Sequence, residues 1–161
     1  MSIDYNLTVS PVVSERAALD YVAKLLGCDR HYSDPDAAAR GDELRIGALR
    51  TGTEHDPEMS DLLGGETETL KIIFHPSKFL TEEADARLFA EMIGAAVRFF
   101  EDFPDAKGTF TFQGEEIYVQ RLGDEGIVLD ERLRGAEYNR EGALDELLAK
   151  YPVRQIDQVF L

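Results

Sequence analysis

Residues 81–100 read TEEADARLFAEMIGAAVRFF, the longest helical pattern in the chain. Thr81 can cap the first turn, and the acidic residues that follow it suit the positive end of a helix dipole. The apolar residues recur on one face and make a broad stripe: Leu88, Phe89, Met92, Ile93, Ala95, Ala96, Val97, Phe99 and Phe100. A stripe of this width predicts that the helix is buried against a sheet, and Pro104 predicts its end.

Strand patterns flank this helix on both sides. Residues 69–75 precede it, with apolar side chains on both faces of a predicted strand. Residues 109–112 and 117–122 follow it and alternate around a turn near Gly114, which is the pattern of a hairpin. Residues 127–129 add a third short strand, so we expect a meander after the helix.

The rest of the chain adds further elements. Residues 2–9 alternate apolar and polar side chains, which predicts a half-buried strand. Residues 15–26 have the apolar spacing of a helix, with Ser14 as its cap and Gly27 as its stop. Weaker patterns predict a strand at 43–50, a last helix at 141–150 and an edge strand within 153–161, and they place loops at 31–42 and 51–66.

Consecutive strands joined by tight turns indicate an antiparallel sheet. We therefore expect a single α+β domain over residues 1–161, with a mainly antiparallel sheet of about five to six strands. Two long helices are expected to pack on one face of this sheet, followed by a short C-terminal helix. The strand order and the oligomeric state stay open, and exposed edge strands would allow a homodimer.

The charge of the chain is strongly negative and is concentrated in two segments. Thirty-two Asp and Glu against seventeen Lys and Arg leave a formal net charge of −15. Residues 29–68 contain eleven acids and four bases, and residues 101–146 contain thirteen acids and five bases, so these segments account for the whole excess. They predict acidic surfaces that suit a basic protein partner and that repel nucleic acids and anionic membranes.

No pattern identifies a catalytic, cofactor-binding or metal site. His31 and His55 lie near carboxylates, but their spacing matches no established metal cage, and His75 is expected to close a strand. The single cysteine, Cys28, is typical of a semi-buried thiol in a reducing compartment. Residues 1–5 lack the features of a signal peptide and the chain lacks an apolar run of about 18 residues, so we expect a cytoplasmic protein without cofactors.

The order of several segments carries a family resemblance. These segments are the opening strand at 3–7, the helix end at 25–27, the long helix at 84–100, and the strands within 112–121 and 127–130. Together they resemble the immunity proteins of the myxobacterial swarming-inhibition toxins, although the acidic segment 29–68 has no counterpart. The resemblance implies a small cytoplasmic protein that protects its producer by binding a sibling toxin, with no chemistry of its own. Its matching positions, such as Gly114, Ile117 and Val119, are framework, so no functional residue is carried over.

We therefore expect a non-enzymatic, immunity-type protein that neutralises a cognate basic toxin domain through an acidic surface. The candidate partner-binding residues are Asp56, Glu58, Asp61, Glu115, Glu116, Asp124 and Glu125. A second hypothesis is a small enzyme or ligand-binding domain with a pocket between the sheet and the long helix, in which one of the histidines is the polar group. A third is an acidic mimic of DNA that inhibits a nucleic-acid-binding protein.

Overall fold

The long helix forms where the sequence predicts it. The computed structural model describes residues 4–32, 37–54 and 57–156. Helix α3 spans Glu82–Asp102, and the Thr81 side chain accepts a hydrogen bond from the backbone N–H of Ala84 at 3.1 Å. Every residue of the predicted apolar stripe is buried, so the prediction for this helix is confirmed. Within the described ranges, no helix has both the length and the apolar character of a membrane span.

In the described part of the chain, a sheet of nine strands lies beside α3, in the order β2-β3-β4-β5-β1-β6-β7-β8-β9. Its strands are β1 (Tyr5–Val9), β2 (Arg30–Tyr32), β3 (Ala37–Arg40), β4 (Leu44–Gly52), β5 (Glu68–Pro76), β6 (Gly108–Phe112), β7 (Glu116–Arg121), β8 (Val128–Asp130) and β9 (Val153–Arg154). All neighbouring strands are antiparallel except β8 and β9, which are parallel. The α+β class is confirmed, but the expected number of five to six strands was too low.

The additional elements come from segments that the sequence places in loops. Strands β2 and β3 and helix α2 (Pro57–Leu62) fall largely within 31–42 and 51–66, so the prediction of continuous loops there was wrong. Strand β3 reads AAAR, which lacks alternation and β-branched residues, and it pairs with β4 along its whole length. Helix α2 has six residues, too few to show a clear helical period. Tertiary contacts, rather than local pattern, decide these elements.

The C-terminal part also differs in detail. Helix α4 (Asp145–Lys150) is shorter than the predicted helix at 141–150. The cause lies at Glu141, whose φ of 57° is left-handed and interrupts a helix, so a separate 3-10 turn (Arg140–Gly142) precedes α4. The predicted edge strand exists as β9, whereas residues 157–161 lie outside the described residues.

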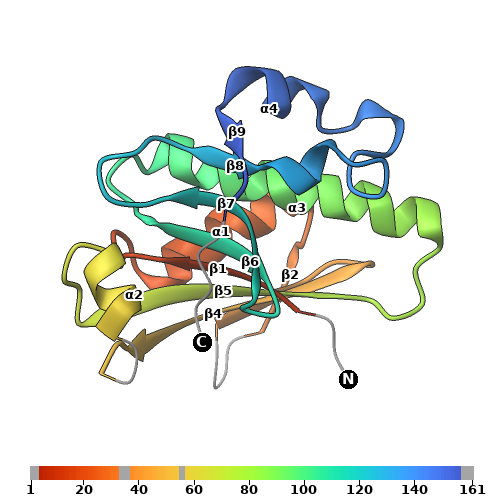
Figure 1. The fold of residues 1–161 in the computed structure, drawn as a ribbon. Coiled ribbons are helices and arrows are strands. Elements are labelled where there is room, and N and C mark those ends of the chain that lie inside the picture. Colours follow the sequence, from red (N-terminus) through yellow and green to blue (C-terminus); the bar gives the residue numbers. More distant parts are fainter. Residues whose placement is uncertain (1–3, 33–36, 55–56, 157–161) are drawn as a thin grey trace.

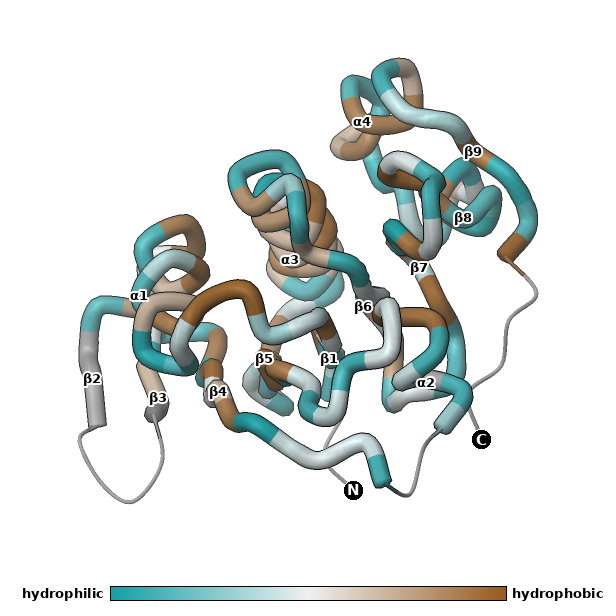
Figure 2. The backbone as a smooth tube through the Cα atoms, turned by 90° about the vertical axis from the view of Figure 1, so that its left-hand side faces the viewer, coloured by the Kyte–Doolittle hydropathy of each residue, from teal (hydrophilic) through white to brown (hydrophobic). Residues whose placement is uncertain are grey.

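The helices and the sheet form layers around α3. Helix α1 (Glu15–Leu26) and α3 lie on the same face of the sheet (Figure 2). Leu7 and Val9 of the central strand β1 face these helices and are fully buried. Strands β7 and β8 lie beside α3, and α4 lies on the far side of β8 and β9 from the rest of the sheet (Figure 1). One buried cluster joins all these layers, since it includes Leu129 of β8 and Leu144, just before α4.

An arginine from the sheet holds the C-terminus of α3. Arg121 of β7 donates hydrogen bonds to the carbonyl oxygens of Phe100 and Phe103, both at 2.7 Å, and to that of Ala106 at 2.6 and 2.9 Å. Its guanidinium lies 5.1 Å from the centroid of the Phe100 ring. Burial lowers the pKa of this guanidinium, but an arginine stays protonated in proteins. Because the last turn of α3 contains no basic residue, Arg121 supplies the positive charge that the carbonyl end of a helix favours.

The start of β6 passes unusually close to β1. A Cβ atom at Gly108 would lie 2.1 Å from the carbonyl oxygen of Thr8 and 2.7 Å from the Cα of Val9. Both are backbone atoms of a central strand, so neither can move aside without disturbing the sheet. The absence of a side chain at Gly108 therefore allows the chain to pair closely with β1 when it rejoins the sheet after α3.

Replacing Arg121 should strongly destabilise the fold. We expect Arg121→Met to lower the free energy of unfolding by about 3 kcal/mol, because three carbonyl groups lose a charged donor, and Arg121→Lys to cost less. Arg16→Met is the control, since Arg16 makes an exposed pair with Asp20 at 3.5 Å and its loss should cost less than about 0.5 kcal/mol. Urea denaturation measures all three. Equal losses for Arg121→Met and Arg16→Met would contradict the role given to Arg121.

Two glycine-to-alanine substitutions should have opposite signs. Gly108→Ala should destabilise the protein by about 3 kcal/mol, because its Cβ would overlap backbone atoms of β1. A Cβ atom at Gly94, inside α3, would enter open space, with no atom beyond the backbone of its own helix within 4 Å. Gly94→Ala should therefore stabilise the protein by about 1 kcal/mol through helix propensity. Thermal and urea unfolding of both variants give the comparison. A stable Gly108→Ala protein would show that β6 can shift away from β1.

Candidate functional site

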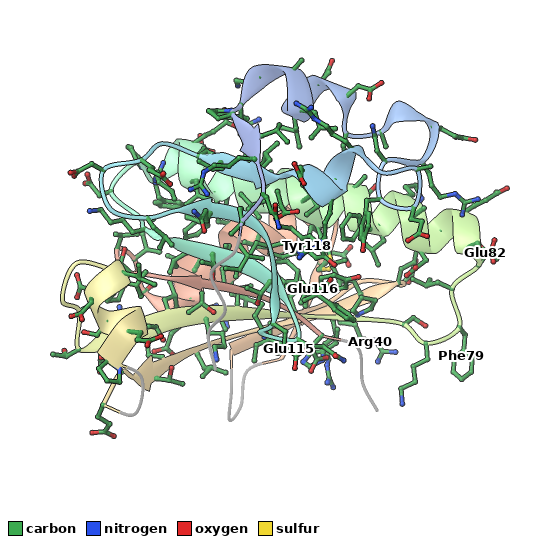
Figure 3. All side chains as sticks on the ribbon, viewed as in Figure 1. Arg40, Phe79, Glu82, Glu115, Glu116 and Tyr118 are labelled. Carbon is green, nitrogen blue, oxygen red and sulfur yellow. The ribbon has the colours of Figure 1, made fainter. Side chains whose placement is uncertain are left out.

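The candidate acidic residues fall at two ends of strand β7. At one end, exposed acids come from α2 and from the turn after β7: Glu58, Asp61, Asp124 and Glu125. At the other end, Glu115 and Glu116 lie at the tip and on the adjoining strand of the β6–β7 hairpin (Figure 3). The strand has six residues, so the two groups are separated by roughly 20 Å. The remaining candidate, Asp56, lies outside the described residues.

An apolar contact brings the first group together. Leu63, just after α2, and Leu122, just after β7, form a buried cluster against which Leu62 packs. Their segments are distant in the sequence but lie at the same end of the sheet (Figure 1). We call this surface the acidic end and define it by Glu58, Asp61, Asp124 and Glu125.

The acidic end is only partly neutralised by neighbouring bases. Glu125 pairs with Arg154 of β9 at 2.9 Å, and both side chains are about half exposed. Within the described residues, Glu58, Asp61 and Asp124 form no ion pair. Exposed carboxylates that lack cations repel one another weakly in water and would gain from a cationic partner that excludes the water. The arrangement suits recognition of a basic surface.

Glu116 accepts a hydrogen bond from a buried tyrosine of its own strand. The pairing register of β6 and β7 shifts at a β-bulge, which leaves Tyr118 as an additional residue of β7. Tyr118 packs edge-on against Phe89 of α3, with ring centroids 5.4 Å apart, and its hydroxyl donates to Glu116 at 3.1 Å. Burial, and secondarily the charge of Glu116, raises the pKa of the Tyr118 phenol. Glu116 is therefore a half-buried acceptor within an aromatic cluster, whereas Glu115 at the hairpin tip is exposed.

His75 is the one histidine whose side chain the structure describes, and it does not line the pocket between α1 and α3. His75 does pair with a carboxylate, since its Nδ1 lies 2.5 Å from Oδ1 of Asp4, and both side chains are about one quarter exposed. The side chain of His31 and all of His55 lie outside the description. A pocket of about 410 Å³ beside α3 is formed with α1 and with Leu147 of α4, and the described residues that line it include no histidine. The described residues hold no group of three or more metal-ligating side chains.

One large apolar side chain stands apart from these sites. Phe79, in the connection between β5 and α3, is 94% exposed. It projects at the side of the molecule opposite α2 (Figure 3). A solitary exposed apolar residue is common on protein surfaces, so we do not include it in the acidic end.

The sequence identified the acids but not their grouping. It placed Glu58 and Asp61 in a loop, because the six-residue helix that carries them has no readable period. The available signal was the apolar pair Leu62-Leu63 within an acidic segment, which indicates a segment that docks on the body of the protein. Only the contact of Leu63 with Leu122 shows where it docks.

Comparisons of this chain with protein-family models, with curated proteins and with solved structures found no match.

The buried tyrosines should make the protein lose stability at alkaline pH. Burial raises the pKa of Tyr5 to about 12 and also raises the pKa values of Tyr21 and Tyr118. A phenol whose pKa is higher in the folded state contributes stability below the unfolded value of about 10, and this contribution is lost as the pH rises toward the folded value. We expect the free energy of unfolding to fall between about pH 10 and pH 12, and to fall less in Tyr118→Phe.

Tyrosinate absorbance in native buffer and in urea tests this assignment. At about pH 11 the folded protein should contain fewer ionised phenols than the unfolded chain. Titration of all six tyrosines together near pH 10 in the folded protein would contradict it.

Proposed function

We propose that this chain is a non-enzymatic, immunity-type protein that binds and neutralises a cognate bacterial toxin domain with a basic surface. The observation that carries the proposal is the acidic end, where exposed carboxylates of α2 and of the turn after β7 meet through the Leu63–Leu122 contact. The sequence resemblance to toxin-immunity proteins supports the same class of function. Under this proposal the protein acts by covering the toxin surface rather than by changing it chemically.

The geometry of the acidic end suits fast recognition of a cation-rich partner. Glu58, Asp61 and Asp124 are exposed on elements that the buried leucines anchor to the sheet, so complex formation would not require the sheet to rearrange. Opposed charges raise the rate of encounter and disfavour like-charged partners. The overall charge of −15 adds a long-range attraction that salt screens.

The two groups of candidate acids have different roles in this proposal. The acidic end makes the contact, and Glu115 lies roughly 20 Å away, at the other end of β7. Glu116 keeps the Tyr118 hydroxyl satisfied inside the protein. An interface of standard size buries about 800 Å² on each partner, so the hairpin tip would lie at its rim or outside it.

Neutralising the acidic end should slow association with the proposed partner, a basic toxin domain to be sought among the products of neighbouring genes. We expect Glu58→Gln, Asp61→Asn and Asp124→Asn, combined in one protein, to lower the association rate constant at least tenfold at low salt. The dissociation rate constant should change less, and the difference from wild type should shrink at high salt. Surface plasmon resonance at several salt concentrations measures both rate constants.

The control removes three charges elsewhere on the protein. Glu137, Glu141 and Glu146 are exposed and lie on the segment around α4, so changing them to Gln alters the net charge equally. This variant should lose only the weak long-range attraction. Equal effects of the two triple variants would refute a localised contact, and absence of any complex with wild type by calorimetry would refute the proposed function.

A further inference from the structure

A row of polar side chains crosses the sheet on the face turned away from α1 and α3. Lys71 of β5 lies opposite Thr8 of β1, Thr8 lies opposite Thr109 of β6, and Thr109 lies opposite Gln120 of β7. Side chains that are directly opposite in neighbouring strands lie about 5 Å apart. Leu7 and Val9 alternate with Thr8 and face the helices, so this row faces the other way.

Three of these four polar side chains are buried, and Lys71 is partly exposed. Thr8 is 8% exposed, and Thr109 and Gln120 are each 1% exposed. The hydroxyl of Thr109 and both amide atoms of Gln120 have no hydrogen-bond partner among the described residues. Leaving a buried polar group unpaired costs about 1–3 kcal/mol, so such groups are expected where something else pairs with them.

The row borders a polar pocket of about 260 Å³. Its lining consists of threonines, an asparagine, a lysine and two glycines: Asn6, Thr8, Thr51, Gly52, Thr53, Thr69, Lys71, Thr109, Thr111 and Gly114. Among the residues that the structure describes, no carboxylate contributes to this lining, and Lys71 is its only ionised side chain. That is a marked contrast with a chain whose acids outnumber its bases almost two to one.

Part of the lining is already held in place. The hydroxyls of Thr51 and Thr69 lie 2.9 Å apart and are hydrogen-bonded to each other, and the Thr53 hydroxyl donates to the Glu66 carbonyl at 2.8 Å. These groups form a fixed wall. The lining groups left to bind a guest include the Lys71 ammonium and the Thr109 hydroxyl, both of which can donate hydrogen bonds.

We propose that this pocket binds a small oxyanion, the carboxylate or phosphate group of a compact hydroxylated compound. The anionic oxygens would accept hydrogen bonds from Lys71 and Thr109, and the neighbouring hydroxyl groups of the ligand would meet the remaining threonines. A volume of about 260 Å³ admits a ligand of roughly monosaccharide size and excludes a drug-sized one. This site is independent of toxin binding, because it lies on the sheet face and uses none of the residues of the acidic end.

Nuclear magnetic resonance of threonine methyl groups tests the proposal in the full-length protein. The probes are inorganic phosphate, gluconate and the neutral analogue glucose, each added at constant ionic strength. We expect phosphate, gluconate or both to shift the methyl signals of Thr8, Thr109 and Thr111, and glucose to leave them unchanged. Phosphate and gluconate differ in their anionic group. The anion that binds more tightly therefore identifies the group that the pocket prefers.

Three variants connect the shifts to the pocket. Lys71→Met should weaken anion binding at least tenfold, and Lys78→Met, which removes an exposed lysine from the connection before α3, should leave it unchanged. Thr109→Val keeps the shape of the side chain and removes the hydroxyl. It should weaken binding several-fold without lowering the unfolding temperature of the ligand-free protein.

Several results would overturn the proposal. They are the absence of methyl shifts with both anions, equal shifts with glucose, and anion binding that survives Lys71→Met. A Thr109→Val protein that binds normally but unfolds at a lower temperature would show that the hydroxyl is structural. The unfolding temperatures of all variants show whether each one is folded.

Discussion

The hydrogen bonds of Arg121 to the end of α3 are the interaction on which the rest of the structure depends. They tie strand β7 to the carbonyls of Phe100, Phe103 and Ala106, which are the last turn of the helix and the connection to β6. The chain then turns back at Gly108, where it passes so close to β1 that a side chain would not fit. The position of α3 over the sheet, and the start of the β6–β7 hairpin, are thereby set together.

Both proposed surfaces follow from this geometry. Leu122, just after strand β7, contacts Leu63, and this contact places α2 and its acids beside the turn at Asp124. The same strand contributes Gln120 to the polar row on the opposite face of the sheet from α3. A protein of this charge can therefore present an acidic end to a basic partner and keep a pocket lined by uncharged side chains and a lysine elsewhere, because separate parts of one sheet carry the two surfaces.

The sequence predicted the elements whose pattern is long and local. The Thr81 cap, the buried stripe of α3, helix α1 with its Ser14 cap, and the β6–β7 hairpin all depend on residues a few positions apart. It failed where elements are short and depend on distant neighbours. Strand β3 is an alanine-rich segment that becomes a strand by pairing with β4, and α2 is held by a leucine of another segment. The polar row was missed for a related reason, since threonines alternating along a strand usually indicate a solvent-facing side.

The sequence by itself determined the inward and outward faces of the main helices and strands. The helical period of 3.6 residues and the strand period of 2 both appear in the spacing of apolar residues that are close in the sequence. It also determined that the acidic excess lies in residues 29–68 and 101–146. Only the tertiary structure decided that Asp61 and Asp124 share a surface, that Glu116 supports Tyr118, and that Lys71, Thr109 and Gln120 stand in one row. Strand order and register depend on contacts between residues that are far apart in the sequence. A local pattern therefore cannot show which distant segment pairs with a given strand.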